Sequence, residues 1–325
     1  MSEERGRFTV VPLVEPPVAE GEPSVMEKPN ERETSPLRDW IVLIRPEQWV
    51  KNTLVFAALI FSKHLFIPQS VGRSALTFVA FCLLASAAYV VNDVHDADRD
   101  RRHPLKSLRP IASGKISVPA ALMVAGILAA AALALAATLG AEFGAIAVIY
   151  LVLQLLYSYV LKDVVIVDAM AIATGFVLRA VAGGVAISVH VSPWLIMCTF
   201  LLALFLSFSK RRHEVVLLED QAFAHRASLR DYSPYFLDQM ISVVTASTVV
   251  AYGIYTVSPE VREKLHTDQL YLTIPFVLYG IFRYLYLVHQ REGGGNPTRE
   301  LLTDRPLWVN VLLWIGTAIW LLYAH

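Results

Sequence analysis

The sequence predicts an all-α, polytopic membrane protein, and three observations lead to this fold class. Of the 325 residues, 55% are hydrophobic and the mean hydropathy is +0.51, a strongly apolar composition. The apolar residues form long blocks, and a block of about 18 or more can cross a hydrocarbon core about 30 Å thick. The blocks lack strand-like alternation, so each is expected to be a helix that satisfies its own backbone hydrogen bonds.

Nine apolar blocks predict nine transmembrane helices in one bundle. They lie at residues 49–67, 74–92, 118–139, 142–161, 164–187, 192–208, 238–257, 269–289 and 306–323. The first block is the weakest, because it carries Lys51, Asn52 and two further polar residues. Residues 1–36 are polar, hold six prolines and show no period, which predicts a disordered tail before a membrane domain at 37–325.

The charges of the loops predict an orientation, because Lys and Arg concentrate in cytoplasmic loops. With the N-terminus inside, the inner loops carry fifteen Lys and Arg and the outer loops carry four. The tail is therefore expected in the cytoplasm, and every long charged loop on the cytoplasmic face of the cell's inner (plasma) membrane. The net charge is zero, so the sequence shows no excess of basic residues of the kind that binds nucleic acid.

Acidic residues follow the second block directly, in the stretch NDVHDADRD. Four polar side chains recur there at helical spacing and share one helix face: Asn92, Asp93, Asp96 and Asp100. Asp98 points elsewhere. Like charges repel, and Mg2+ is the natural counter-ion, since it commonly binds one or two carboxylates plus substrate phosphates. The alternative is a solvated surface patch, but acids that continue a spanning helix are usually functional.

Basic residues come next, in RDRRHPLKSLRPIASGKIS. Lys and Arg both bind phosphate. The Lys ammonium acts as a point charge, and the planar Arg guanidinium can donate two parallel hydrogen bonds. Anchoring to the cytoplasmic side explains Arg99, Arg101 and Arg102. Lys106 and Arg109 are the candidates for a substrate phosphate. His95, His103 and His213 form no ligand set with a cysteine, which argues against zinc.

The first acidic stretch together with HPLKSLRPIASGKIS resembles the first Asp-rich motif of the UbiA-type intramembrane prenyltransferase superfamily. The resemblance covers most of residues 38–325 and implies that the acids hold Mg2+ against a diphosphate at a cytoplasmic mouth. The superfamily has a second Asp-rich motif after the sixth helix. Here that place reads SFSKRRHEVVLLED, with Lys210 and Arg211 before the acidic Glu214. This difference from the second Asp-rich motif argues against a prenyl diphosphate as substrate. It indicates instead a polar substrate that carries an extra phosphate.

Four stretches in order resemble the decaprenyl-phosphate phosphoribosyltransferase branch of the superfamily: LIRPEQWVKN, YSYVLKDVVIVDAMAIATGFVLRAVAGG, SFSKRRHE and LLTDRPLW. The resemblance implies a glycosyltransferase that moves 5-phosphoribose from 5-phosphoribosyl diphosphate to decaprenyl (polyprenyl) phosphate. Diphosphate leaves, and the product is a lipid-linked precursor of the arabinan of the actinobacterial cell wall.

The expected site follows from spacing and resemblance together. The catalytic candidates are Asp93, Asp96, Asp100 and Asp168, and the metal candidates are Asn92, Asp93, Asp96 and Asp100. The phosphate-binding candidates are Lys51, Asn52, Asn92, Lys106, Arg109, Tyr157, Lys162, Lys210 and Arg211. Asp168, Gly175 and Arg179 share one stripe of the fifth predicted helix, in which Asp168 should face the first acids and Gly175 should leave a gap.

Two other functions stay open. One is a UbiA-type prenyltransferase that uses a prenyl diphosphate donor and an aromatic acceptor. The other is a transporter or lipid-binding membrane protein, which would not release diphosphate. Small residues on helix faces also permit a homo-oligomer among the membrane lipids.

Overall fold

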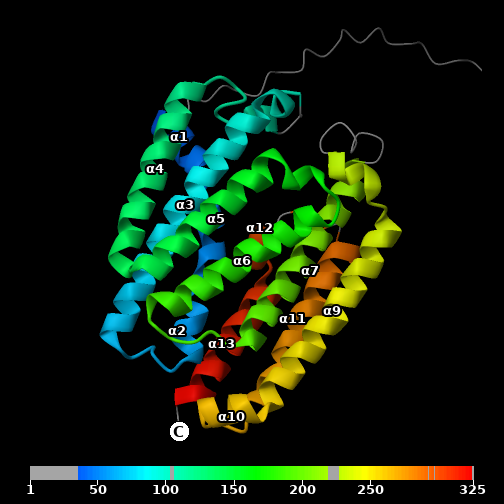
Figure 1. Cartoon of the computed structure of the whole chain (residues 1–325). Coiled ribbons are helices and arrows are strands. Elements are labelled where there is room, and N and C mark those ends of the chain that lie inside the picture. Colours follow the sequence, from blue (N-terminus) through cyan, green and yellow to red (C-terminus); the bar gives the residue numbers. More distant parts are fainter. Residues whose placement is uncertain (1–35, 103–105, 219–226, 292, 296, 324–325) are drawn as a thin grey trace, which may run out of the picture. The chain divides into compact units, whose positions relative to one another are not determined.

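The computed structural model describes residues 36–102, 106–218, 227–291, 293–295 and 297–323, in which the regular segments are all helices (Figure 1). The α-helices are α1 (Pro36–Ile44), α2 (Phe56–Phe61), α3 (Pro68–Asp100), α4 (Val118–Leu139), α5 (Ala141–Tyr159), α6 (Val167–Ala186), α7 (Pro193–Leu218), α9 (Pro234–Val257), α10 (Pro259–Leu265), α11 (Ile274–Gln290), α12 (Pro297–Thr303) and α13 (Arg305–Tyr323). The 3-10 helices are η1 (Pro46–Val55), η2 (Lys106–Leu108), η3 (Leu161–Asp163), η5 (Ala227–Asp231) and η6 (Leu270–Thr273). The predicted tail lies outside the described residues, except Pro36.

Eight helical segments of the described chain are long and apolar enough to cross a membrane. They correspond to the second through ninth apolar blocks, so the all-α, polytopic class is confirmed. The first block, 49–67, is not one continuous helix but consists of η1, α2 and a turn. The count of nine spans is therefore not confirmed.

A break at Arg45 explains the irregular first block. Arg45 lies between α1 and η1 with φ 52°, in the left-handed region. Pro46 follows it, and a proline disfavours helical backbone in the preceding residue. The ten residues of η1 then run as a 3-10 helix, although runs longer than three or four residues are uncommon. The indole of Trp49 donates to Ser86 Oγ at 3.0 Å and holds η1 against α3.

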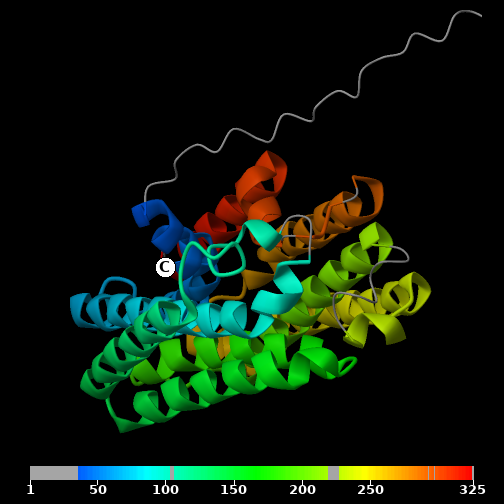
Figure 2. The same ribbon diagram turned by 90° about the horizontal axis from the view of Figure 1, so that it is seen from above.

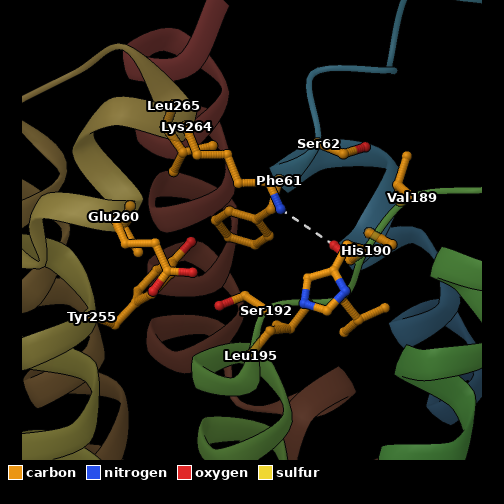
Figure 3. Close-up of a pocket in the computed structure, with 13 residues that line it drawn as sticks. Phe61, Ser62, Val189, His190, Ser192, Leu195, Tyr255, Glu260, Lys264 and Leu265 are labelled. Atoms are coloured by element: carbon orange, nitrogen blue, oxygen red, sulfur yellow. Dashed lines mark hydrogen bonds between the residues drawn. The ribbon is translucent and has the colours of Figure 1, made fainter.

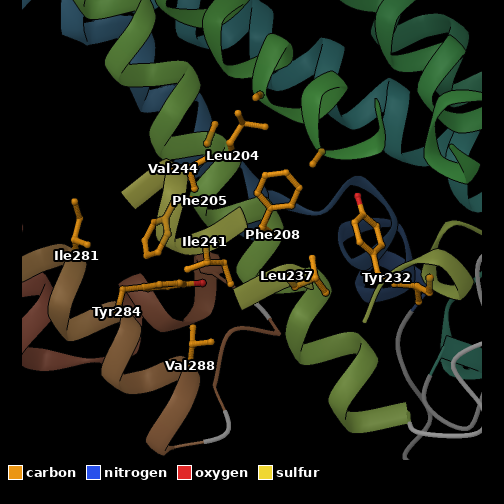
Figure 4. Packing of buried hydrophobic residues seen from close by; sticks show 14 of the residues in the cluster. Leu204, Phe205, Phe208, Tyr232, Leu237, Ile241, Val244, Ile281, Tyr284 and Val288 are labelled. Carbon is orange, nitrogen blue, oxygen red and sulfur yellow. The ribbon is translucent and has the colours of Figure 1, made fainter. Parts of the chain in front are cut away.

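Helix α6 lies at the centre of the bundle and contributes to two hydrophobic cores. Ala182 and Ala186 belong to a core with α3, α4 and α5. Ala169 and Ala173 belong to a core with α7, α9 and α11, part of which Figure 4 shows around Phe205. Seen from above, α4 and α5 lie on one side of the bundle and α11 and α13 on the other (Figure 2). Both ends of α6 are thereby fixed by packing.

Small residues let α6 approach the irregular first segment closely. A Cβ atom at Gly183 would lie 2.0 Å from the carbonyl oxygen of Val55, at the end of η1. No side chain fits at that distance, so glycine is what permits the contact. Close backbone approach through small residues is the usual way in which membrane helices pack.

We expect Gly183→Ala to lower the thermal unfolding midpoint clearly in detergent micelles. Overpacking a filled core typically costs about 1–3 kcal/mol, and here the obstacle is backbone rather than a side chain that can turn away. Gly126→Ala, in α4, is the matched control, because a Cβ there meets nothing within 4 Å. Equal midpoints for the two variants would contradict this packing.

Candidate functional site

The acidic side chains of α3 and α6 lie at the same end of the bundle. Helix α3 ends with the acidic stretch, and Asp168 lies in the first turn of α6. Asp93 and Asp168 are buried, with 3% and 0% of their surface exposed. Asp98 is different, because its side chain is 85% exposed and pairs with Arg101, as the spacing along α3 predicts. We call this end the acidic mouth.

Two arginines hold the buried carboxylates of α3. Arg109 Nη1 lies 3.1 Å from Asp93 Oδ1 and 2.6 Å from Asp100 Oδ2, so that one guanidinium bridges two acids. Arg45 Nη2 approaches the same Asp93 oxygen at 2.5 Å. The break after α1 and the loop after α3 therefore both supply counter-charge to α3.

A lysine from the next helical hairpin neutralises Asp96. Lys162, in η3, is 2% exposed, and its Nζ lies 2.5 Å from Asp96 Oδ1. Asn92 donates from Nδ2 to the other oxygen, Oδ2, at 3.1 Å. The spacing of α3 predicted that Asn92 and Asp96 share a face, and this hydrogen bond agrees with it.

Asp168 forms a second buried ion pair, with Arg211 of α7. Arg211 Nε donates to Asp168 Oδ2 at 2.6 Å, and both side chains are almost fully buried. Arg211 also binds Glu214 Oε2 at 2.5 Å and reaches the hydroxyl of Tyr157 at 3.4 Å. Removing one partner of a buried pair typically costs about 3–5 kcal/mol, since the other charge stays uncompensated.

The hydroxyl of Tyr232 completes the surroundings of Asp168. It donates to Asp168 Oδ1 at 2.8 Å and accepts from the backbone N–H of Ile166 at 2.7 Å. Burial and the neighbouring carboxylate raise the pKa of Tyr232, so the hydroxyl keeps its proton and remains a donor. Ile166 has φ 67°, which is strained for a β-branched residue, and such strain concentrates at functional sites.

The two acidic groups are joined through the segment between α5 and α6. Lys162, which binds Asp96, accepts a hydrogen bond at its carbonyl from Ser228 Oγ at 2.9 Å. Ser228 belongs to η5, a few residues before Tyr232, which binds Asp168. Asp168 and Asp96 are therefore linked indirectly, through Tyr232, η5 and Lys162.

The other predicted phosphate ligands fall into two groups. Lys210 Nζ lies 3.8 Å from Glu214 Oε1, so it belongs to the acidic mouth, and Lys106 lies in η2, three residues before Arg109. Lys51 and Asn52 lie further along η1. Asn52 is fully buried and contacts Arg179 rather than an acid of the mouth.

The gap predicted at Gly175 is filled. A Cβ atom there would lie 3.2 Å from Gln154 Nε2 and 3.5 Å from Arg179 Nη1. The Arg179 side chain folds back along its own helix and donates to the Gly175 carbonyl at 2.8 Å. The missing side chain thus gives room to the Arg179 guanidinium and to the Gln154 side chain of the neighbouring α5.

Three contributors escaped the sequence analysis: Arg45, Tyr232 and Glu214. Arg45 had a local signal, since Arg-Pro at the start of an apolar block indicates a helix break. Glu214 follows a run of basic residues in the sequence, and no spacing links it to the other acids. Tyr232 had no signal, because it lies 64 residues from Asp168 in the chain.

The stretch LLTDRPLW has a structural explanation. Asp304 precedes α13 and accepts from the Leu307 N–H at 2.9 Å, which caps the helix. Arg283 of α11 donates to both of its carboxylate oxygens, at 3.1 and 2.7 Å. These hydrogen bonds lower the pKa of Asp304, so this carboxylate stays charged and ties α13 to α11.

A pocket lies at the opposite end of α6 and α7, away from the acids (Figure 3). Phe61, His190, Tyr255 and Lys264 are among its lining residues, and Lys264 Nζ donates to the His190 carbonyl at 3.3 Å. None of the predicted site residues lines it. The acidic mouth is therefore the better candidate on chemical grounds, because its charges converge from several elements.

Comparisons with known proteins identify the family of this chain. The UbiA prenyltransferase family matches residues 53–300 of this chain. Decaprenyl-phosphate phosphoribosyltransferase of Mycolicibacterium smegmatis is 33% identical over 287 residues, which cover 85% of this chain and 90% of that protein. The protein of the same name from Corynebacterium glutamicum is 34% identical over 289 residues, covering 87% and 86%.

A solved structure has the same fold. A UbiA homologue from Archaeoglobus fulgidus, bound to GPP and Mg2+, aligns with a TM-score of 0.68 at 19% identity. The alignment covers 87% of this chain and 99% of that chain.

The fold and the relatives together define a multi-pass membrane transferase. The chain belongs to the UbiA prenyltransferase family, and its relatives named decaprenyl-phosphate phosphoribosyltransferase match it over most of its length. The resemblance drawn from the motifs is thereby confirmed.

We expect Tyr232→Phe to destabilise the protein by about 1–3 kcal/mol, the usual cost of leaving buried polar groups unpaired. Asp168 Oδ1 would lose its donor from Tyr232, and the strained Ile166 N–H would lose its acceptor. Tyr235→Phe is the matched control, since Tyr235 is 75% exposed. Thermal unfolding of both variants in micelles measures the difference, and a wild-type midpoint for Tyr232→Phe would refute these bonds.

Proposed function

We propose that the protein transfers 5-phosphoribose from 5-phosphoribosyl diphosphate to decaprenyl phosphate or a similar polyprenyl phosphate. Diphosphate is released, and the lipid-linked product serves the arabinan of the cell wall. The reaction takes place at the acidic mouth, on the cytoplasmic side of the inner membrane. The identity of 33–34% to relatives named for this activity supports the proposal.

The observation that carries this proposal is the mixture of charges at the mouth. Five acids there lie against five cations in the described residues: Asp93, Asp96, Asp100, Asp168 and Glu214 against Arg45, Arg109, Lys162, Lys210 and Arg211. Cations on every side of the acids suit a donor that carries a diphosphate and a further phosphate.

The residues of α3 fit Mg2+ that is shared with a substrate. No group of three His, Cys, Asp or Glu side chains in the described chain converges on one point, so the residues alone offer no closed cage. Mg2+ rarely needs one, because it commonly binds one or two carboxylates together with substrate phosphates and waters. Asp93 and Asp96, with Asn92, Asp100 and Asp168 beside them, would supply these oxygen ligands. When bound, Mg2+ would offset the negative charge of the diphosphate.

The reaction requires the protein mainly to position the two substrates and to stabilise the negative charge of the leaving diphosphate. A phosphate monoester is mostly ionised at neutral pH, its second pKa being about 6, so the acceptor needs no general base. An acceptor oxygen attacks C1 of the ribose, the bond from C1 to the diphosphate breaks, and the diphosphate leaves with the electron pair. Direct displacement inverts C1. Arg109, Lys162 and Arg211 are already at the mouth to stabilise the leaving charge.

Release of diphosphate tests the reaction. Purified protein in lipid nanodiscs should release diphosphate from 5-phosphoribosyl diphosphate only when polyprenyl phosphate and Mg2+ are both present. Release from a prenyl diphosphate with an aromatic acceptor would instead support an ordinary prenyltransferase, and no release with either pair would point to a transporter or lipid-binding protein.

We expect Asp93→Asn and Asp96→Asn each to lower turnover by about 100-fold or more, the size of effect seen when one group that stabilises charge is lost. Additional Mg2+ should not restore the rate fully. Asp98→Asn is the matched control on the same helix, because its side chain is 85% exposed and pairs with the exposed Arg101. Near-normal turnover of both Asp93 and Asp96 variants, with unchanged unfolding midpoints, would remove their proposed role.

A further inference from the structure

The pocket of Figure 3 lies at the end of the bundle opposite the acidic mouth, and four segments build it. Glu260 and Lys264 belong to α10 and lie four residues apart. Phe61 is the last residue of α2, Tyr255 lies near the end of α9, and His190 belongs to the loop after α6. None of these side chains has a role at the acidic mouth, so the pocket is a separate feature of the bundle.

The two charges of α10 are not paired with each other. A glutamate four residues before a lysine on one helix face usually attracts it. Here Lys264 reaches across the pocket, and its Nζ donates to the His190 carbonyl at 3.3 Å (Figure 3). The Glu260 carboxylate has no hydrogen bond or ion pair with any described residue. A negative and a positive group therefore line the same pocket, and neither neutralises the other by direct contact.

The hydroxyl of Tyr255 is an independent indication of a ligand. This side chain is only 8% exposed and lines the pocket. Its ring packs edge-on against Phe61, with the ring centres 6.4 Å apart. The hydroxyl has no hydrogen bond with any described residue, although buried tyrosine hydroxyls usually find a partner. The pocket therefore holds a buried polar group that a bound donor would satisfy.

The pocket lies at the level where spanning helices end. The span of α7 begins at Pro193 and that of α9 ends at Val257, and lining residues lie close to both points. Lipid headgroups lie at this level, just outside the hydrocarbon core. Met197, Ile254 and Val257 are exposed on the same helix ends, and such apolar side chains favour contact with acyl chains. A lipid that covers them brings its headgroup to the pocket, which favours a membrane lipid over a soluble ligand.

The charges of the pocket select the type of headgroup. The Glu260 carboxylate and the aromatic faces of Phe61 and Tyr255 attract an ammonium. The Lys264 ammonium attracts a phosphate. Residues four apart on a helix have Cβ atoms about 5–6 Å apart, which is comparable to the separation of the two charges in a headgroup where two carbons link ammonium and phosphate. A headgroup with a phosphate but no ammonium would place a second negative charge beside Glu260.

We propose that this pocket binds the headgroup of a zwitterionic phospholipid with a primary ammonium, of the phosphatidylethanolamine class, in the leaflet opposite the acidic mouth. The ammonium donates to the Glu260 carboxylate and to the Tyr255 hydroxyl, and Lys264 binds the phosphate. The bound lipid joins α10 to α2 and to the loop after α6. The site lies outside the proposed reaction, and no step of phosphoribose transfer depends on it.

Lipid titration of the full chain in detergent micelles tests the site. Native mass spectrometry measures the affinities for phosphatidylethanolamine and for phosphatidylglycerol with the same acyl chains. Wild type should bind phosphatidylethanolamine about tenfold more tightly, as expected when an ammonium gains a hydrogen bond to a charged group. Glu260→Gln should remove this preference by weakening phosphatidylethanolamine binding, and it should leave phosphatidylglycerol binding no weaker. Lys264→Gln should weaken both lipids, since both carry a phosphate.

Helix α10 itself supplies the matched controls. Glu263→Gln removes the same charge as Glu260→Gln, and Arg262→Gln removes one positive charge, as Lys264→Gln does. Glu263 and Arg262 are exposed on the same helix but do not line the pocket. Both control variants should bind the two lipids as wild type does.

Two results overturn the site: equal affinity of wild type for the two lipids, and a Glu260→Gln variant that binds both lipids as Glu263→Gln does. Tyr255→Phe is a second variant, which keeps the ring and removes only the hydroxyl. It should weaken phosphatidylethanolamine without changing phosphatidylglycerol, and unchanged affinity for both lipids would refute the contact with Tyr255. The titration contains no 5-phosphoribosyl diphosphate, so its result and the diphosphate-release assay can fail independently of each other.

Discussion

The structure depends on the compensation of carboxylate charge at one end of a membrane bundle. Asp93, Asp100 and Asp168 are buried, and each is within 3.1 Å of an arginine nitrogen that comes from another segment. Burying such acids alone would be prohibitive, and pairing them with cations is what allows the helices to come together here. The same pairs tie α3 to the loop after it and α6 to α7. The ion pairs that assemble the candidate site are therefore also contacts that hold this end of the bundle together.

Irregular backbone supplies the groups that regular helices could not. Arg45 reaches Asp93 because the chain breaks before Pro46, and Lys162 reaches Asp96 from the short η3 between α5 and α6. Ile166 is held in a strained conformation immediately before α6, with its N–H bound to Tyr232. At Arg45 and Lys162, a departure from α-helix directs a cation toward an acid of the mouth, and at Ile166 it directs an N–H to the hydroxyl that donates to Asp168. Regular α3 and α6, packed in the cores, act as the rigid frame for these donors.

The interior of the bundle differs in charge from the acidic mouth. At the mouth, acids and cations lie side by side in ion pairs. Further in, the guanidinium of Arg179 is held by the Asn52 amide, by the Tyr150 hydroxyl and by the face of the Tyr150 ring.

The sequence by itself determined the all-α class, the eight long spans and the helix face shared by Asn92 and Asp96, because hydropathy and helical spacing are local properties. Its motifs also indicated the family. The tertiary structure alone decided which cation neutralises which acid. Arg211 is 43 residues from Asp168, and Tyr232 is 64 residues from it. The hydropathy of the first block predicted one span. In the structure, the chain breaks at Arg45 and forms η1 and α2 instead, with Gly183 packed on Val55. Pairings across such distances follow from how helices pack, and no local pattern in one chain encodes that packing.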